Sequence, residues 1–130
     1  MRTEFVQAMV GRIYTVRRTT LLLALMAAAL VLASGVALAQ NFVGTDRGER
    51  IVGTDSADTI DANGGDDTVI GKRGADRIRG GNGRDKHYGG RGKDTIFSEG
   101  GYRDLVNCGK GTDTAYVDSK DQVVNCERKR

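Results

Sequence analysis

Apolar positions in residues 44–97 recur every nine residues and do not form one continuous hydrophobic block. In nine-residue units, the eighth position holds Ile51, Ile60, Val69, Ile78, His87 and Ile96. The last three positions of a unit, as in Thr-Val-Ile or Thr-Ile-Phe, place an inward apolar residue between β-favouring neighbours. This pattern predicts a β-strand of about three residues at the end of each unit.

The polar positions follow the same period. The six units span residues 44–52, 53–61, 62–70, 71–79, 80–88 and 89–97, and their sixth positions are Glu49, Asp58, Asp67, Asp76, Asp85 and Asp94. Glycine fills position four at 65, 74, 83 and 92, and position one at 53, 71, 80 and 89. Glycine at these two positions predicts positive φ angles and tight turns that aim carbonyl oxygens at one spot, where aspartate adds a hard anionic ligand. Each unit therefore combines a turn, a ligand and a strand.

Two units carry a family signature in full. Residues 80–85 (Gly-Gly-Asn-Gly-Arg-Asp) and 89–94 (Gly-Gly-Arg-Gly-Lys-Asp) resemble the RTX, or haemolysin-type, calcium-binding repeat Gly-Gly-x-Gly-x-Asp-x-U-x, in which U is a large apolar residue. The resemblance is close over residues 53–97 and looser to about residue 126. It implies an all-β fold, a parallel β-roll in which each nonapeptide supplies half a turn of a right-handed β-solenoid.

The resemblance also implies calcium sites between turns that lie two repeats apart on the same edge. Carried onto this sequence, it pairs Asp58 with Asp76, Asp67 with Asp85, and Asp76 with Asp94, with backbone carbonyls as further ligands. Asp66, Asp104 and Asp113 complete the set of expected metal ligands. It stacks Ile60, Ile78 and Ile96 in one row, and Ile51, Val69, His87 and, after a shift, Val106 in the other.

Several positions depart from the family pattern. Position five holds Arg84 and Lys93 beside two expected sites, which predicts weaker calcium affinity. The first repeats lack glycine at position two, so they are expected to form turns without complete metal sites. His87 takes an apolar position; we interpret it as part of the thin core in preference to a metal ligand or pH sensor, because a buried imidazolium would be costly.

The repeat frame slips after Phe97, because Asp104, Asp113 and Asp121 follow at intervals of ten, nine and eight residues. We expect residues 98–130 to form degenerate repeats, a C-terminal cap and a tail. An exported chain meets an oxidising environment, so Cys108 and Cys126 are expected to form a disulfide in this cap. A zinc or redox role is not favoured, because the sequence has no Cys-x-x-Cys motif and no second histidine.

The N-terminal segment has the features of a signal peptide. Arginines at 12, 17 and 18 precede an apolar run over residues 21–32, and residues 37–39 are Ala-Leu-Ala, a small-x-small cleavage site. This predicts a signal peptide over residues 1–39, a lead-in and degenerate repeat over 40–52, RTX-type repeats over 53–97, and secretion to the outside of the cell. The alternative is an uncleaved membrane anchor, since residues 21–39 are long enough to span a bilayer.

The net charge of the chain does not change this interpretation. The whole chain carries a formal charge of +3, but residues 40–130 hold 16 basic and 16 acidic residues. No basic excess remains for nucleic acid or an anionic membrane, so neither is an expected partner, and the mature chain is not expected to be membrane-embedded. The cations between the aspartates are interpreted as solvated residues, with a polyanion-binding strip as the alternative: Lys72, Arg73, Arg77, Arg79, Arg84, Lys86, Arg91 and Lys93.

Calcium is expected to be a folding requirement as well as a ligand. The chain has 19 Gly, no Trp and only seven Phe and Tyr, and so small a core does not offset the entropy of ordering so many glycines. Metal that binds only the folded state would supply the missing free energy. The expected function is calcium ion binding by a secreted, non-enzymatic β-roll, with an unidentified extracellular or cell-surface partner.

Two other functions stay open. A calcium-independent β-solenoid scaffold or adhesin would favour regular threonine rows, but position seven reads Arg, Thr, Thr, Arg, Lys, Thr. A relative of RTX-tailed exported enzymes would need catalytic residues, but the sequence has one histidine and neither Gly-x-Ser-x-Gly nor His-Glu-x-x-His. The chain is therefore not expected to be an enzyme.

Overall fold

The computed structural model describes residues 38–130, which form strands and turns and contain no helix. The signal peptide predicted over residues 1–39 lies outside the described residues except for its last two positions. Among the described residues, no helix is long and apolar enough to cross a membrane. The eleven strands are β1 (Asn41–Val43), β2 (Arg50–Val52), β3 (Thr59–Asp61), β4 (Thr68–Arg73), β5 (Arg77–Arg79), β6 (Lys86–Gly92), β7 (Thr95–Ser98), β8 (Leu105–Gly111), β9 (Thr114–Val117), β10 (Gln122–Val124) and β11 (Arg128–Lys129).

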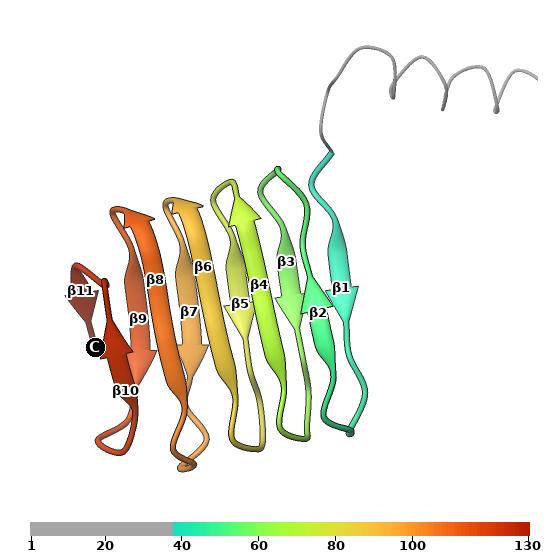
Figure 1. Cartoon of the computed structure of the whole chain (residues 1–130), viewed down its shortest axis with the longest axis vertical. Helices are drawn as coiled ribbons and strands as arrows, with labels where there is room; N and C mark the ends of the chain where they lie inside the picture. The colour runs from blue at the N-terminus through green and yellow to red at the C-terminus, as the bar shows by residue number, and fades with distance from the viewer. Residues whose placement is uncertain (1–37) are drawn as a thin grey trace, which may run out of the picture. The chain divides into compact units, whose positions relative to one another are not determined.

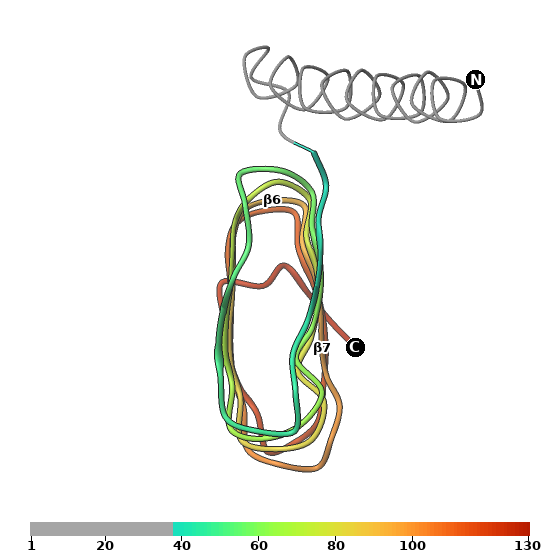
Figure 2. The same cartoon turned by 90° about the vertical axis from the view of Figure 1, so that its right-hand side faces the viewer.

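Successive strands alternate between two parallel sheets, so the chain winds as a β-solenoid. Sheet A has the order β1-β3-β5-β7-β9-β11, and sheet B has the order β2-β4-β6-β8-β10. Figure 1 shows the strands stacked along the solenoid, and Figure 2 shows the winding end-on as a flattened ring with one sheet on each long side. The predicted parallel β-roll is confirmed.

The nine-residue period sets the register of both sheets. Ile60 pairs with Ile78 and Ile78 with Ile96 in sheet A, so residues 18 apart stack directly. Sheet B stacks Ile51, Val69, His87 and Val106 in the same way. Both predicted core rows are confirmed, and all of these side chains except the half-buried Ile51 are fully buried between the sheets.

His87 is enclosed in the row of sheet B. It is 0% exposed, and neither ring nitrogen has a hydrogen-bond partner. Desolvation by burial lowers its pKa to about 4, although the nearby charge of Asp104 opposes this shift. The imidazole therefore fills the core as a neutral ring, at the cost of two buried polar atoms without partners.

The glycine turns differ in part from the expectation. Position-four glycines have positive φ, such as +116° at Gly74 and +129° at Gly83, as predicted. Position-one glycines do not. Glycine is required there for space, because a Cβ at Gly71 or Gly89 would collide with the carboxylate of Asp76 or Asp94.

Three strands of sheet B are also longer than the predicted three residues. β4, β6 and β8 span six or seven residues because their turn residues pair as well, for example Lys72 with Gly90 and Gly90 with Gly109. Backbone pairing therefore continues into the edge of the roll.

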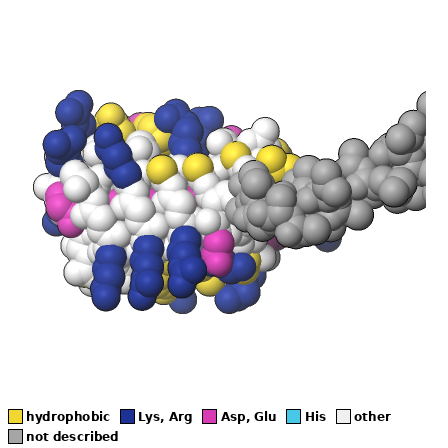
Figure 3. Space-filling model, turned by 90° about the horizontal axis from the view of Figure 1, so that it is seen from above, with side chains coloured by type: hydrophobic (Ala, Val, Ile, Leu, Met, Phe, Trp, Pro, Cys, Tyr) yellow, Lys and Arg dark blue, Asp and Glu magenta, His cyan; other side chains and the backbone are white. Residues whose placement is uncertain are grey.

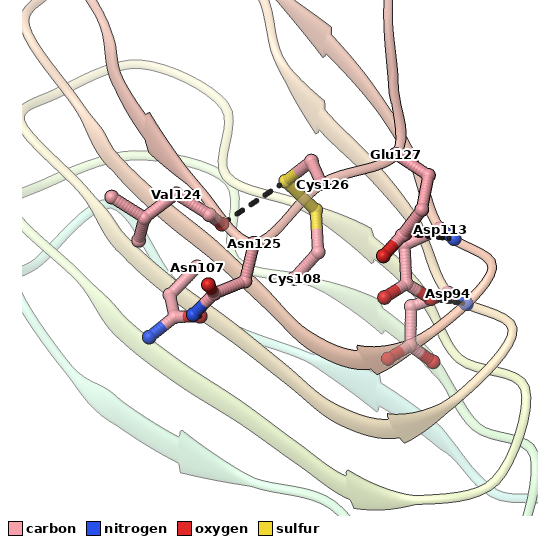
Figure 4. Close-up of a disulfide and its surroundings, with 8 residues drawn as sticks. All are labelled: Asp94, Asn107, Cys108, Asp113, Val124, Asn125, Cys126 and Glu127. Carbon is pink, nitrogen blue, oxygen red and sulfur yellow. Dashed lines mark hydrogen bonds between the residues drawn. A yellow bond between two sulfur atoms is a disulfide. The ribbon is translucent and has the colours of Figure 1, made fainter.

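The C-terminal turns absorb the frame slip. The sheet-B register lengthens to 19 residues at His87 and Val106, then shortens to 17 at Val106 and Val123. A disulfide joins Cys108 to Cys126, as predicted, and Figure 4 shows it between the last turns. Closing a loop of this length stabilises the fold by about 3 kcal/mol. β11 then pairs with β9 and ends sheet A.

Replacement of His87 with leucine should stabilise the roll. Leucine removes two unpartnered buried nitrogens, so we expect the free energy of unfolding at pH 7 to rise by about 1–3 kcal/mol. The folded pKa lies below the unfolded value, so His87 costs stability as pH falls from about 6.5 to about 4. The part of the free energy of unfolding that is lost through protonation of His87 at low pH should not be lost in H87L, as measured by urea unfolding at several pH values. Val69→Leu, which adds bulk to the same row without removing a polar group, should give no gain. Equal effects of the two variants would contradict this account.

Candidate calcium-binding edges

The sixth-position carboxylates line the two edges of the roll. We call the turns from sheet A to sheet B the AB edge, which is lower in Figure 1, and the turns from sheet B to sheet A the BA edge, which is upper. The AB edge holds Glu49, Asp67, Asp85, Asp104 and Asp121, and the BA edge holds Asp58, Asp76, Asp94, Asp113 and Glu127. Alternate repeats therefore send their carboxylates to opposite edges, as the sequence predicted.

Each carboxylate on the BA edge accepts a hydrogen bond from the backbone of the preceding turn. The amide of Asp58 donates to Oδ1 of Asp76 at 2.8 Å, and the amide of Asp76 donates to Oδ1 of Asp94 at 2.9 Å. The amide of Asp94 donates to Asp113 at 2.7 Å, and that of Asp113 to Oε2 of Glu127 at 2.8 Å. Figure 4 shows the last three side chains in succession. Together these bonds form a carboxylate ladder along the edge.

A second ladder follows the AB edge. The amides of Glu49, Asp67 and Asp85 donate to Oδ1 of Asp67, Asp85 and Asp104 at 2.7–2.8 Å. The amide of Asp104 donates to Asp121 at 3.0 Å. The ladders bring together the three expected pairs of ligands: Asp58 with Asp76, Asp67 with Asp85, and Asp76 with Asp94.

Five ladder carboxylates keep one oxygen without a partner. These buried Oδ2 atoms belong to Asp67, Asp76, Asp85, Asp94 and Asp113. Each of these side chains is 2% exposed or less. A buried carboxylate oxygen without a hydrogen bond is costly unless a cation compensates its charge. The residues therefore fit calcium, which prefers carboxylate and carbonyl oxygens.

Hydroxyl groups occupy the second oxygen in other turns. Oγ1 of Thr54 donates to Oδ2 of Asp58 at 2.9 Å, and the Thr54 amide donates to the same atom at 2.6 Å. Oγ of Ser98 donates to Oδ2 of Asp104 at 2.7 Å. Thr45 makes the corresponding bonds to Glu49. In these turns a neutral hydroxyl or amide donor satisfies the second carboxylate oxygen. In the turns without such a donor, a cation would have to satisfy it.

Sequence reasoning missed these hydroxyl donors, although a signal was available for two of them. Thr45 and Thr54 each precede the sixth-position carboxylate by four residues, in Gly-Thr-Asp segments. Ser98 and Glu127 lie outside the nine-residue frame, and Glu127 follows Asp113 by 14 residues where the repeat gives 18. The period alone could not identify them.

Burial shifts the titration of the carboxylates that lack a second partner. Desolvation raises the pKa of Asp76, Asp85 and Asp94 to about 6. It also raises the pKa of Asp67 and Asp113. In each case the backbone hydrogen bond opposes the shift without cancelling it. These groups therefore resist ionisation in the fold and favour a cation that stabilises the charged form.

Asp66 lies apart from the ladders. Its exposed side chain accepts a hydrogen bond from the amide of Arg84 at 2.9 Å, and it lines a surface hollow together with Asp67, Asp85 and Asp104. Within residues 38–130, no three His, Cys, Asp or Glu side chains are grouped closely enough to hold a metal ion. Calcium at these edges would therefore need backbone carbonyls beside the paired carboxylates.

Comparison with protein families gives one match. The family model of the RTX calcium-binding nonapeptide repeat matches in four copies, over residues 43–78, 62–96 and 70–105. Residues 43–105 belong to this repeat family. Comparisons with curated proteins and with solved structures gave no match.

The RTX match and the ladders extend over different parts of the chain. The matched repeats end at residue 105, whereas the carboxylate ladders continue to Asp121 and Glu127. The turn before Asp113 still has glycines in register with Gly90 and Gly92, whereas the last turns keep the edge interaction without glycine. This explains why the RTX-type edge is longer than the RTX sequence signature.

Ser98→Ala tests the role of a hydroxyl donor. The substitution leaves Oδ2 of Asp104 buried without its partner, so we expect the free energy of unfolding to fall by about 1–3 kcal/mol. Urea unfolding followed by circular dichroism at millimolar calcium would measure the change. Ser119→Ala, at an exposed turn, is the matched control and should change stability by less than about 0.5 kcal/mol. The same loss in both variants would show that the Asp104 contact does not matter.

Proposed function

We propose that residues 40–130 act as a secreted, non-enzymatic module that binds calcium ions along both edges of the roll and folds fully only with them. The observation that supports this proposal best is the set of five buried carboxylate oxygens without a partner, repeated along the two ladders. Membership of residues 43–105 in a calcium-binding repeat family supports the same choice of ion.

The proposed ligands follow from the free oxygens. Asp76, Asp94 and Asp113 would hold calcium on the BA edge, and Asp67 and Asp85 on the AB edge, each with backbone carbonyls of neighbouring turns. Asp58 and Asp104, which were also expected as ligands, already have hydroxyl donors on their second oxygen. They would contribute more weakly. When bound, calcium supplies positive charge that offsets the buried carboxylates.

The non-enzymatic role is supported by the state of the reactive side chains. His87, the one histidine of the chain, is sealed in the core. Within the described residues both cysteines are joined in a disulfide, and the buried aspartates are held in the ladders. These groups are not arranged as a nucleophile and base within reach of a substrate. Export remains part of the proposal, supported by the disulfide and by the signal-peptide features of residues 1–39.

Calcium titration tests the proposal directly. We expect calcium to increase the β-sheet circular dichroism signal and excess EGTA to reverse it. Asp94→Asn keeps an acceptor for the Asp76 amide but removes the charge, so it should lower calcium affinity by about tenfold or more. Asp55→Asn is the control, because this exposed aspartate lies on the same edge outside the ladder. A spectrum unchanged by EGTA, with no calorimetric heat at millimolar calcium, would favour the calcium-independent scaffold instead.

The stabilisation by calcium should depend on pH. The pKa values of Asp76, Asp85 and Asp94 are raised to about 6 in the fold. These groups therefore stabilise the calcium-free fold fully below about pH 4, and this contribution is lost as pH rises through about 6. Calcium binds the deprotonated form, so its effect on Tm should be larger at about pH 7.5 than at about pH 5. Differential scanning calorimetry in the H87L background measures this without the opposing titration of His87. An equal effect at both pH values would contradict the assigned ligands.

A further inference from the structure

A row of cations follows the BA edge on the outside of the roll. Arg73 pairs in register with Arg91, and Arg91 pairs with Lys110, at the ends of β4, β6 and β8. Neighbouring strands are about 4.8 Å apart, so the three side chains begin one strand spacing from each other. All three are exposed. Figure 3 looks onto this edge and shows Lys or Arg side chains side by side along the stacking direction.

The charges of this basic row, Arg73, Arg91 and Lys110, are poorly compensated on the surface. Only Arg73 has an acidic partner, and its Nη1 lies 4.0 Å from Oδ2 of the exposed Asp55. Within the described residues, Arg91 and Lys110 form no salt bridge. Like charges directly opposite each other destabilise a sheet. The fold therefore carries a repulsion here that it does not need for its own stability.

The surface beside the row is open. The three cations line a shallow hollow together with Asp55, Lys72 and Gly90. Gly90 and Gly109 have positive φ and no side chain that would hold a ligand away from the backbone. The exposed Lys72 and Lys93 add two further cations at the same edge. The result is a strip that is long in the stacking direction and positive along most of its length.

We propose that this basic row binds a linear acidic polysaccharide that lies along the stacking axis of the roll. Arginine forms bidentate contacts with carboxylate and sulfate groups. A polymer with one acidic group per sugar can present successive charges at a spacing close to that of the strands. Neighbouring strands of sheet B would then contact successive sugars.

The side chains of this surface favour a polysaccharide over nucleic acid. Single-stranded nucleic acid is held by aromatic side chains that stack on the bases. The row and its hollow contain no aromatic residue.

Calcium bears on this site through the carboxylates beneath it. Asp76, Asp94 and Asp113 lie on the same edge, and their negative charge opposes anion binding unless it is offset. The inference therefore rests in part on the proposed calcium binding. Calcium titration without polysaccharide tests that function separately, so the failure of one can be distinguished from the failure of the other.

The experiment compares two triple variants at low salt and millimolar calcium. R73Q/R91Q/K110Q removes the row, and R47Q/R50Q/K86Q removes the same charge from exposed positions elsewhere. The probes are a heparin octasaccharide, an octamer of galacturonic acid and an eight-nucleotide oligothymidine, measured by calorimetry. Circular dichroism verifies that each variant folds. Single variants R91Q and K110Q replace the triple if it does not fold.

We expect the row variant to bind one or both oligosaccharides about tenfold to a hundredfold more weakly than the unchanged protein, with the control close to unchanged. The affinity of the unchanged protein should fall as salt is raised. The sulfated and uronate probes distinguish the acidic group that is recognised. Equal affinity in the two triple variants, no binding of either oligosaccharide, or tighter binding of the oligothymidine would overturn the proposal.

Discussion

A carboxylate oxygen that accepts a backbone hydrogen bond from the preceding turn of the same edge is the contact on which the rest of the roll depends. It recurs along both edges, from Asp58 to Glu127 on one and from Asp67 to Asp121 on the other. The same contact fixes the distance between turns and so the strand register. It also places the second carboxylate oxygen in a buried position, where that oxygen must find a donor or a cation. Structural support and a charged site are therefore consequences of one arrangement.

The position-one glycines follow from this arrangement. Their lack of a side chain leaves room for the carboxylate, as the contacts around Gly71 and Gly89 show. The glycines of the RTX signature, which all suggest tight turns, are thus required for two separate reasons. Positive φ requires glycine at position four, and the space taken by the carboxylate requires it at position one. Only the first cause could be predicted from propensity, because the second depends on where the side chain five residues later, at position six, lies in the folded turn.

The resemblance to the RTX repeat, which the nine-residue period carries, predicted most of the fold. It implied the stacking of residues two repeats apart, the two core rows and the alternation of aspartates between edges, and each was found. The lengths of β4, β6 and β8 did not follow, because pairing of the turn residues depends on the neighbouring turn. The expected ligands form two groups according to their second oxygen: Thr54 and Ser98 satisfy Asp58 and Asp104, whereas Asp76 and Asp94 keep a free oxygen. That division depends on individual hydroxyl positions, which no period specifies.

The thin core limits where recognition can occur on this molecule. Most strands send one side chain into the interior, and β7 and β8 each bury a second, Ser98 and Cys108. The interior is therefore filled mainly by two rows of side chains, one of which includes His87. Core side chains fill the space between the sheets of residues 38–130, and the ladder aspartates are buried within the edges. Recognition of a larger partner must therefore use outward rows, such as the basic row along the BA edge, whose spacing is the strand spacing. A partner with its own linear repeat matches such rows better than a compact one, because each added turn of the roll adds an equivalent contact.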